Sequence, residues 1–319
     1  MNKFVFDFEK PIVELENKIQ EMHELAADGK VDISTEIDQL EEKAEKLRDE
    51  VYSNLNRWQR VQIARHPRRP YTLDYIERIT DSFQELHGDR LYRDDRAIVA
   101  GLATIDSVPL AIIGHQKGRG TKLNIFRNFG MPHPEGYRKA LRVMKLAEKF
   151  GLPIVTLIDT PGAWPGLGAE ERGQAEAIAR NLFEMSTLRV PIISVVIGEG
   201  GSGGALALGV TDRIIMLEYS VYSVITPEGC ASILYRDANL ANKAAEALRI
   251  TPTDLQELEI IDEIIDEPVG GAHHDWDFVA SNVKKSIICK LEELKKIDID
   301  ELIEERIDKY GNIGFFDED

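Results

Sequence analysis

The sequence has little cysteine: Cys230 and Cys289 are the only two in 319 residues, and they lie far apart. Neither belongs to a Cys-x-x-Cys pair, which argues against a disulfide framework and against a structural zinc site. We therefore expect no metal site in this chain. Sparse cysteine is also typical of proteins from a reducing compartment, so we expect a cytoplasmic protein.

Long hydrophobic runs and an excess of basic residues are also missing. No apolar stretch reaches the roughly 18 residues of a membrane-spanning helix, and Asp7 and Glu9 interrupt the region where a secretory signal would be apolar. The formal net charge is -17, so the average field repels phosphate backbones and anionic lipids. Nucleic-acid binding and membrane binding are therefore poor hypotheses.

The first 70 residues carry two apolar stripes at helical spacing. The stripes are Ile12, Leu15, Ile19, Met22 and Ala26, followed by Ile37, Leu40, Ala44, Leu47, Val51 and Trp58, with a break at residues 28–30 between them. They predict an N-terminal helical arm of two segments. So narrow a stripe needs a cover, either the main domain or a second subunit. The basic, proline-containing run at residues 65–70 is interpreted as a solvated linker that ends the arm.

Short apolar runs alternate with amphipathic segments after the arm. The runs are residues 97–103, 109–113, 153–158, 191–197 and 213–217, and helices are expected at 135–149, 169–187 and 203–209. Strands that are apolar on both faces predict an α/β domain with a buried, largely parallel sheet. We divide the chain into an arm and linker (1–70), a core (71–268) and a C-terminal helical segment with an acidic tail (269–319).

Two predicted strands end in glycine-rich turns that lead into helices. One turn covers residues 159–166 (DTPGAWPG), and the other covers residues 198–205 (GEGGSGGA). Glycine lets backbone approach a ligand closely, and the first N–H groups of a helix have no internal partner. If the amides of Gly203 and Gly204 converge with the Gly162 and Ala163 turn, they form a site for an oxyanion. Packing alone does not require five glycines between residues 198 and 204.

Simpler motifs overlap the same turns. Gly198, Gly200 and Gly203 fit a dinucleotide fingerprint with Glu218 downstream, although that fingerprint normally opens its domain. Residues 200–204 fit the nucleophile elbow of a serine hydrolase around Ser202. That alternative would take Asp254 or Asp262 and His273 or His274 as partners. A GTPase is excluded, because residues 114–122 lack the phosphate-binding loop.

Several longer motifs resemble a known family. They are residues 198–207 (GEGGSGGALA), 158–163 (IDTPGA), 223–234 (SVITPEGCASIL), 128–132 (NFGMP) and 134–140 (PEGYRKA). Together they closely resemble the alpha subunits of bacterial acetyl-CoA carboxylase carboxyltransferases, and the resemblance covers nearly the whole chain. The resemblance implies a crotonase-like fold, a ββα superhelix whose glycine-rich corners build oxyanion holes.

The resemblance also implies a reaction and partners. Carboxybiotin on a biotin carboxyl carrier protein would deliver CO2 to acetyl-CoA, giving malonyl-CoA for fatty-acid biosynthesis. The alpha subunit would pair with a beta subunit that carries a zinc ribbon, as an α2β2 assembly. ATP would be consumed by a separate biotin carboxylase.

The family's site residues carry over by motif. The amides of Gly203 and Gly204 would bind the biotin ureido oxygen, and Gly162 and Ala163 would shape the facing wall. Because the biotin anion itself would remove the acetyl methyl proton, no protein base is implied. Lys117, Arg119 and Lys122 are candidates for contacts with CoA phosphates or the carrier protein, and Arg138 is a candidate for contact with CoA. Solvated charge is the alternative for each. A serine hydrolase and a non-catalytic scaffold stay open as other function classes.

Overall fold

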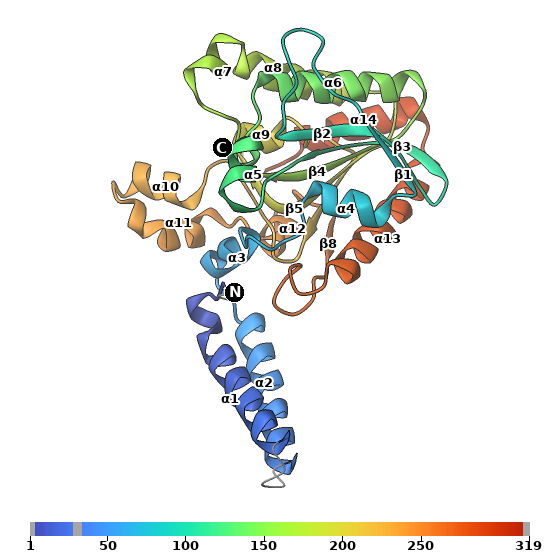
Figure 1. Ribbon diagram of the computed structural model, residues 1–319. Coiled ribbons are helices and arrows are strands. Elements are labelled where there is room, and N and C mark those ends of the chain that lie inside the picture. The colour runs from blue at the N-terminus through green and yellow to red at the C-terminus, as the bar shows by residue number, and fades with distance from the viewer. Residues whose placement is uncertain (1–3, 28–33, 315–319) are drawn as a thin grey trace, which may run out of the picture.

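The structure, a computed structural model, describes residues 4–27 and 34–314. A helical arm projects from an α/β core, and the C-terminal helices pack on that core (Figure 1). The strands are β1 Ser82–Glu85, β2 Ile98–Ile105, β3 Val108–His115, β4 Ile154–Thr160, β5 Ile192–Gly201, β6 Arg213–Leu217, β7 Val221–Ser223 and β8 Glu263–Ile265. Among the described residues, no helix is long and apolar enough to cross a bilayer.

The helices fall into three groups along the chain. Before the sheet come η1 Asp7–Glu9, α1 Lys10–Ala27, α2 Ser34–Ser53, α3 Arg57–Ala64 and α4 Thr72–Ile79. Between strands come α5 Gly120–Phe126, η2 Asn128–Gly130, α6 Pro134–Lys149, α7 Leu167–Glu171, α8 Gln174–Thr187, α9 Ser202–Leu206, α10 Pro227–Leu234, η3 Ala238–Leu240, α11 Ala241–Leu248 and α12 Pro252–Glu257. Finally come α13 Trp276–Leu294 and α14 Ile299–Gly311.

The strands form one sheet in the order β1-β2-β3-β4-β5-β6-β8, and β7 pairs with the end of β5. The pairs β1–β2 and β2–β3 are antiparallel, whereas all the other pairs are parallel. Every residue of β4 and β5 is buried, which explains their largely apolar sequence. The prediction of an α/β domain with a largely parallel sheet is confirmed.

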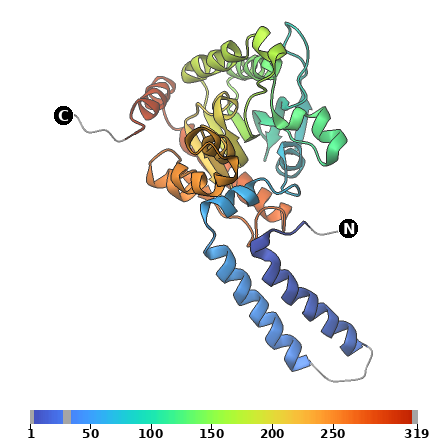
Figure 2. The ribbon, with the colours of Figure 1, turned by 90° about the vertical axis from the view of Figure 1, so that its left-hand side faces the viewer.

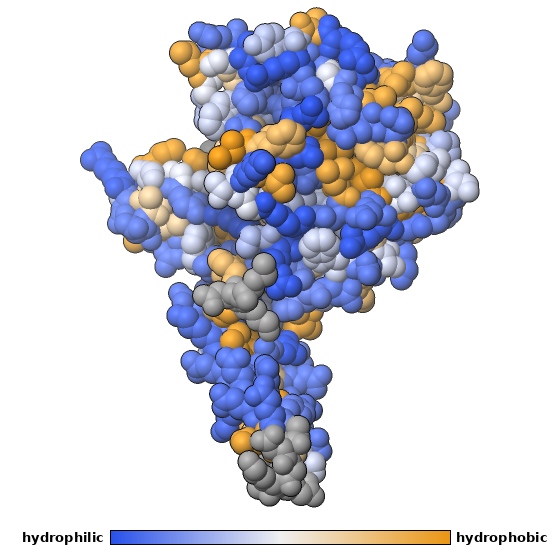
Figure 3. All heavy atoms as spheres, viewed as in Figure 1, coloured by the Kyte–Doolittle hydropathy of each residue, from blue (hydrophilic) through white to orange (hydrophobic). Residues whose placement is uncertain are grey.

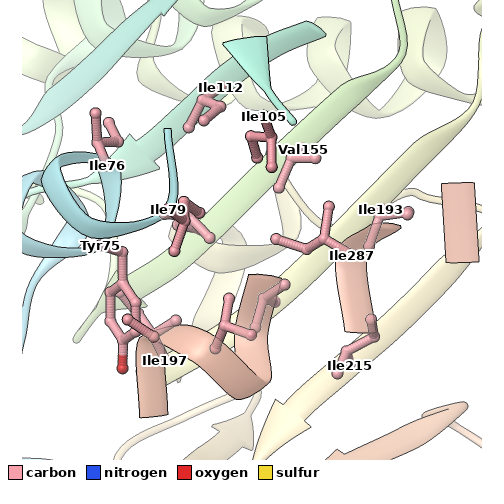
Figure 4. Close-up of a cluster of buried hydrophobic side chains, with 14 of the residues drawn as sticks. Tyr75, Ile76, Ile79, Ile105, Ile112, Val155, Ile193, Ile197, Ile215 and Ile287 are labelled. Carbon is pink, nitrogen blue, oxygen red and sulfur yellow. The ribbon is translucent and has the colours of Figure 1, made fainter. Parts of the chain in front are cut away.

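Two hydrophobic layers cover the sheet. Figure 4 shows one of them, in which Tyr75 and Ile79 of α4 and Ile287 of α13 pack on Val155 and Ile193 of the sheet. The other layer joins α6 and α8 to the opposite face. The apolar residues of β4 are divided between the layers, Val155 and Leu157 in the first and Ile154 and Ile158 in the second, as expected for a strand buried on both faces.

One predicted helix is interrupted. The segment expected as a single helix at 169–187 forms α7 and α8, because Gly173 takes a φ of 81° between them. A left-handed residue ends a helix, and glycine adopts it without steric cost.

The arm is an antiparallel hairpin of α1 and α2 that points away from the core (Figures 1 and 2). Its two apolar stripes face each other, with Ile19, Ile37 and Ala44 buried between the helices. For most of their length the stripes therefore cover each other, and the predicted cover by the main domain was wrong there. Contact of the arm with a second subunit stays a prediction. Trp58 leaves the stripe for α3, and the predicted break at residues 28–30 lies outside the described residues.

The basic run at residues 65–70 is not a solvated linker, contrary to the prediction. Arg69 is 1% exposed and donates to both oxygens of Glu267, each at 2.7 Å. Arg65 pairs with Glu199 and Glu228. The acids come from segments distant in sequence, so the run itself gave no sign of its partners. The predicted division at residues 70 and 268 stays a prediction.

Candidate active site

The two glycine-rich turns meet at the carboxyl ends of the neighbouring strands β4 and β5. Because β4 and β5 are neighbouring parallel strands, the turns that follow them leave the sheet side by side. A β-carbon at Gly204 would stand 2.5 Å from the Ala163 nitrogen and 2.5 Å from the Gly162 carbonyl carbon. A β-carbon at Gly201 would stand 2.3 Å from the Pro161 oxygen. The structure therefore brings together the two turns singled out in the sequence.

The glycines of the second turn differ in what they contact. Gly204 is buried against the first turn, whereas Gly203 is partly exposed, and a β-carbon there would meet only Ile178 methyl groups at 3.6 and 3.7 Å. Close packing therefore explains Gly201 and Gly204 but not Gly203. All three lie at the start of α9, where backbone N–H groups lack helical acceptors. Such N–H groups can stabilise negative charge on an oxygen.

A mostly apolar cavity of about 370 Å³ opens beside the second turn. Ser202 and Gly203 form one part of its lining. The rest includes Leu206, Tyr222, Val224, Leu248, Ile250 and Leu255. Neither a histidine nor a carboxylate belongs to this lining, although Arg249 does, so the cavity can hold an apolar group next to the turn.

The serine hydrolase alternative fails on geometry. Ser202 is exposed with a φ of 54°, as in a nucleophile elbow, but His273 stacks on His66 at a ring distance of 3.7 Å, at the base of the arm. The candidate acids are also engaged elsewhere, Asp254 with Arg57 and Asp262 with Lys309. No triad is assembled around Ser202 in the described residues.

The dinucleotide alternative fails as well. Gly198, the first residue of that pattern, lies inside β5 rather than in the turn after it. A β-carbon at Gly198 would stand 2.5 Å from Asp159 Oδ1, so this glycine makes room for a carboxylate rather than for a pyrophosphate.

Three of the cationic candidates already have internal partners. Lys117 Nζ lies 2.6 Å from Asp159 and 3.1 Å from Glu199, and these carboxylates raise its pKa although burial opposes them. The proposed roles of Lys117, Arg119 and Arg138 toward CoA or the carrier protein stay predictions.

The other two cationic candidates, Arg119 and Arg138, lie on the surface of the core. Arg119 pairs with Asp74 at 2.6 Å and lies over the rings of Tyr71 and Trp276. Arg138 pairs with Asp89 at 2.9 Å. In each case the guanidinium is fixed by neighbours from other segments, which leaves fewer of its donors for a ligand.

Sequence reasoning missed His115 and the acids beneath the turns. His115, at the end of β3, is fully buried, and neither ring nitrogen has a hydrogen-bond partner among the described residues. Burial lowers its pKa to about 3, against the opposing effect of the Gly204 and Leu157 backbone. The imidazole is therefore neutral at neutral pH. The available signal was a polar residue, such as His115, Asp159 or Glu199, at the end of an otherwise apolar strand.

The described residues contain no cluster of His, Cys, Asp or Glu with the geometry of a metal site. The family model described as acetyl co-enzyme A carboxylase carboxyltransferase-like matches residues 5–314.

Curated relatives match over nearly the full length. The acetyl-coenzyme A carboxylase carboxyl transferase subunit alpha of Geobacter metallireducens is 56% identical over 317 residues, covering 99% of each chain. The subunit of the same name from a Geobacillus species is 59% identical over 310 residues, covering 97% of this chain and 95% of the relative.

Solved structures share the fold at low identity. The transcarboxylase 12S core with hydrolyzed methylmalonyl-coenzyme A bound superposes with a TM-score of 0.58 at 21% identity, covering 72% of this chain and 42% of that one. The beta subunit of Pseudomonas aeruginosa geranyl-CoA carboxylase gives 0.54 at 18% identity, covering 74% and 43%. The predicted crotonase-like fold is thereby confirmed. The family match over nearly the whole sequence leads to one conclusion: the chain belongs to the acetyl co-enzyme A carboxylase carboxyltransferase-like family.

Proposed function

We propose that this chain is the alpha subunit of an acetyl-CoA carboxylase carboxyltransferase, which transfers a carboxyl group from carboxybiotin to acetyl-CoA and forms malonyl-CoA. The observation that carries the proposal is the contact between Gly204 and the Gly162–Ala163 turn, in a chain that matches such subunits over 99% of its length. The product would supply fatty-acid biosynthesis.

The chain's own contribution is electrostatic. The amides of Gly203 and Gly204 would donate to an oxygen that gains negative charge, and each well-aligned donor contributes about 3 kcal/mol to a transition state. Gly162 and Ala163 would form the facing wall and keep the donors away from water. Biotin, when bound, would carry the CO2 and accept the methyl proton of the acetyl group.

The adjoining cavity fits such a ligand. Its lining is mostly apolar, and Gly203 lies at its edge, so an apolar ring and chain could occupy it with a polar oxygen at the turn. The absence of a histidine or carboxylate from this lining agrees with chemistry that uses backbone donors.

Exposed apolar side chains support the need for a partner. Leu123, Ile125 and Phe126 of α5 and the nearby Phe129 are about half exposed or more, and apolar side chains gather over α5 in Figure 3. Solvent-exposed apolar groups gathered on one face mark interaction surfaces. We assign this face to a zinc-bearing beta subunit in an α2β2 assembly, which would meet the biotin carboxyl carrier protein and biotin carboxylase in the cytoplasm.

The test is the reverse reaction, decarboxylation of malonyl-CoA with a free biotin analogue. The chain would be assayed alone and coexpressed with a zinc-ribbon partner, each with native Gly204 and with Gly204→Val. Activity only in the native pair supports the proposal. An inactive but assembled native pair counts against carboxyl transfer, and activity unaffected by Gly204→Val would favour a scaffold role for this chain.

A further inference from the structure

Five charged residues form a chain of ion pairs beneath the glycine-rich turns. In order they are Glu228, Arg65, Glu199, Lys117 and Asp159, so acids and bases alternate. Arg65 Nε lies 2.5 Å from Glu199, and Lys117 Nζ lies 3.1 Å from the other oxygen of that carboxylate. Arg65 directly follows α3 and Glu228 lies in α10, so the ion pairs connect the two turns to these helices.

Asp159 lies where the pairing of β4 and β5 becomes irregular. Ile158 pairs with Val196, but Thr160 pairs with Gly200, so three residues of β5 face Asp159 alone. An irregularity of this kind frees backbone groups and redirects the strand that carries the extra residues. Here that strand runs directly into the second turn.

The Asp159 carboxylate replaces the missing ladder contact. Its Oδ1 accepts a hydrogen bond from the Glu199 backbone N–H at 3.0 Å and another from Lys117 Nζ at 2.6 Å. Gly198 allows this approach, because any β-carbon there would stand 2.5 Å from the same oxygen. The Asp159 carboxylate, at the start of the first turn, is therefore bonded directly to Glu199 of the second turn.

Lys117 holds the two acids together. It pairs with both Asp159 and Glu199, and its side chain passes against Gly130, where a β-carbon would stand 2.7 Å from Lys117 Cγ. Without this cation, two buried carboxylates would face each other across the irregular pair and repel.

We propose that Asp159 and Lys117 are positioning residues of the carboxyl-transfer site, holding β4 and β5 in the one register that keeps Gly204 against Ala163. The inference rests on the proposed function, because the amides of Gly203 and Gly204 are the donors there. Both side chains would hold the backbone of the two turns in place, and neither would contact the reacting atoms.

The chain offers a matched control at the opposite end of β5. The Asp212 carboxylate accepts a hydrogen bond from the Ile192 backbone N–H at 2.6 Å and pairs with Arg306 at 2.7 Å, and both side chains are buried. The chemistry is the same as at Asp159, but this end of the strand leads away from the glycine turns. A role in stability alone predicts the same result for both ends.

The experiment compares Asp159→Asn, Lys117→Met and Asp212→Asn in the coexpressed assembly. We expect the first two to lower kcat for malonyl-CoA decarboxylation about tenfold to a hundredfold, with KM within about threefold, because small displacements of a donor cost that much. Amide hydrogen exchange in peptides covering residues 198–206 should also become faster. Asp212→Asn should lower the melting temperature but change neither kcat nor that exchange.

Equal kcat losses in all three variants at equal losses of melting temperature would overturn the inference, as would unchanged kcat and exchange at Asp159 and Lys117. If Asp159→Asn does not assemble, Lys117→Met decides. An inactive native assembly would count against the proposed function, and hydrogen exchange, which needs no turnover, would still test the positioning. An active native assembly that is indifferent to Asp159 and Lys117 would count against this inference alone.

Discussion

Gly204 lies against Ala163 so closely that a β-carbon at position 204 would stand 2.5 Å from the Ala163 nitrogen. Real β-carbons essentially never approach backbone so closely, so any other residue would force the two turns apart. The contact joins the ends of β4 and β5, and the predicted oxyanion donors sit on it. Backbone N–H groups, rather than side chains, are thus the expected polar groups of this site.

Gly204→Ala should lower kcat in the assembled enzyme at least about a hundredfold, because the added methyl group displaces an oxyanion donor. Gly203→Ala is the comparison: its β-carbon would meet only Ile178, at 3.6 Å, and its amide is retained. We expect a smaller loss there, under about tenfold. Steady-state decarboxylation of malonyl-CoA measures both, and equal losses would contradict the steric argument.

Ser202→Ala should keep kcat within about threefold of the native value, because no histidine or carboxylate that could activate its hydroxyl lines the cavity. A fluorophosphonate probe should leave the native serine unlabelled. The same kinetic assay and mass spectrometry of the treated protein check these points. Labelling at Ser202, or a loss as large as that of Gly204→Ala, would restore the hydrolase hypothesis.

Arg69→Met should destabilise the protein by about 3–5 kcal/mol, because it leaves a buried carboxylate unpaired. Glu267 would lose two contacts of 2.7 Å and keep only backbone donors such as the Tyr219 N–H. Urea unfolding followed by circular dichroism measures the change. Arg189→Ala removes a solvent-exposed pair with Asp300 and should cost less than about 1 kcal/mol.

Acid should weaken the protein between about pH 6.5 and pH 4. Burial, with help from Arg68, Arg69 and His274, lowers the pKa of His66 to about 4. A histidine of the unfolded chain, with a pKa of about 6.5, binds its proton first as the pH falls. The stability that His66 contributes is therefore complete above pH 6.5 and is lost progressively down to pH 4, on the order of 3 kcal/mol.

Melting temperatures across this range test the effect. His66→Phe keeps an aromatic ring beside Phe6 and His273 but does not titrate, so its stability should fall less steeply with acid. His23→Gln, at an exposed position of the arm, should follow the native profile. Identical profiles for native protein and His66→Phe would show that this histidine is not the cause.

Ile37→Asp should open the arm and leave the core folded. Ile37 is 5% exposed between the two arm helices, so a carboxylate there costs more than about 2 kcal/mol. Gln39→Asp places the same residue on the exposed face of α2 and is the control. Hydrogen exchange of residues 10–53 should rise only in Ile37→Asp, whereas a cooperative loss of the core would show that arm and core unfold as one unit.

Several elements of the fold could be predicted from local sequence. The β-branched runs of β4 and β5 indicated buried parallel strands, and the glycines after them indicated turns with free backbone donors. These properties follow from periodicity and from the conformational freedom of single residues, which neighbours in sequence determine. Long motifs in a fixed order also indicated the family, since chance rarely reproduces several of them together.

Tertiary structure determined which charged side chains form ion pairs and what covers the apolar side chains. Lys117 and Arg69 looked like solvated cations because Asp159, Glu199 and Glu267 are distant in sequence. The arm's stripes looked unpartnered until the hairpin folded them onto each other. Ser202 and His273 had the right chain order for a hydrolase but lie at separate sites. Electrostatic and packing energies depend on distance in space, which sequence order alone does not give.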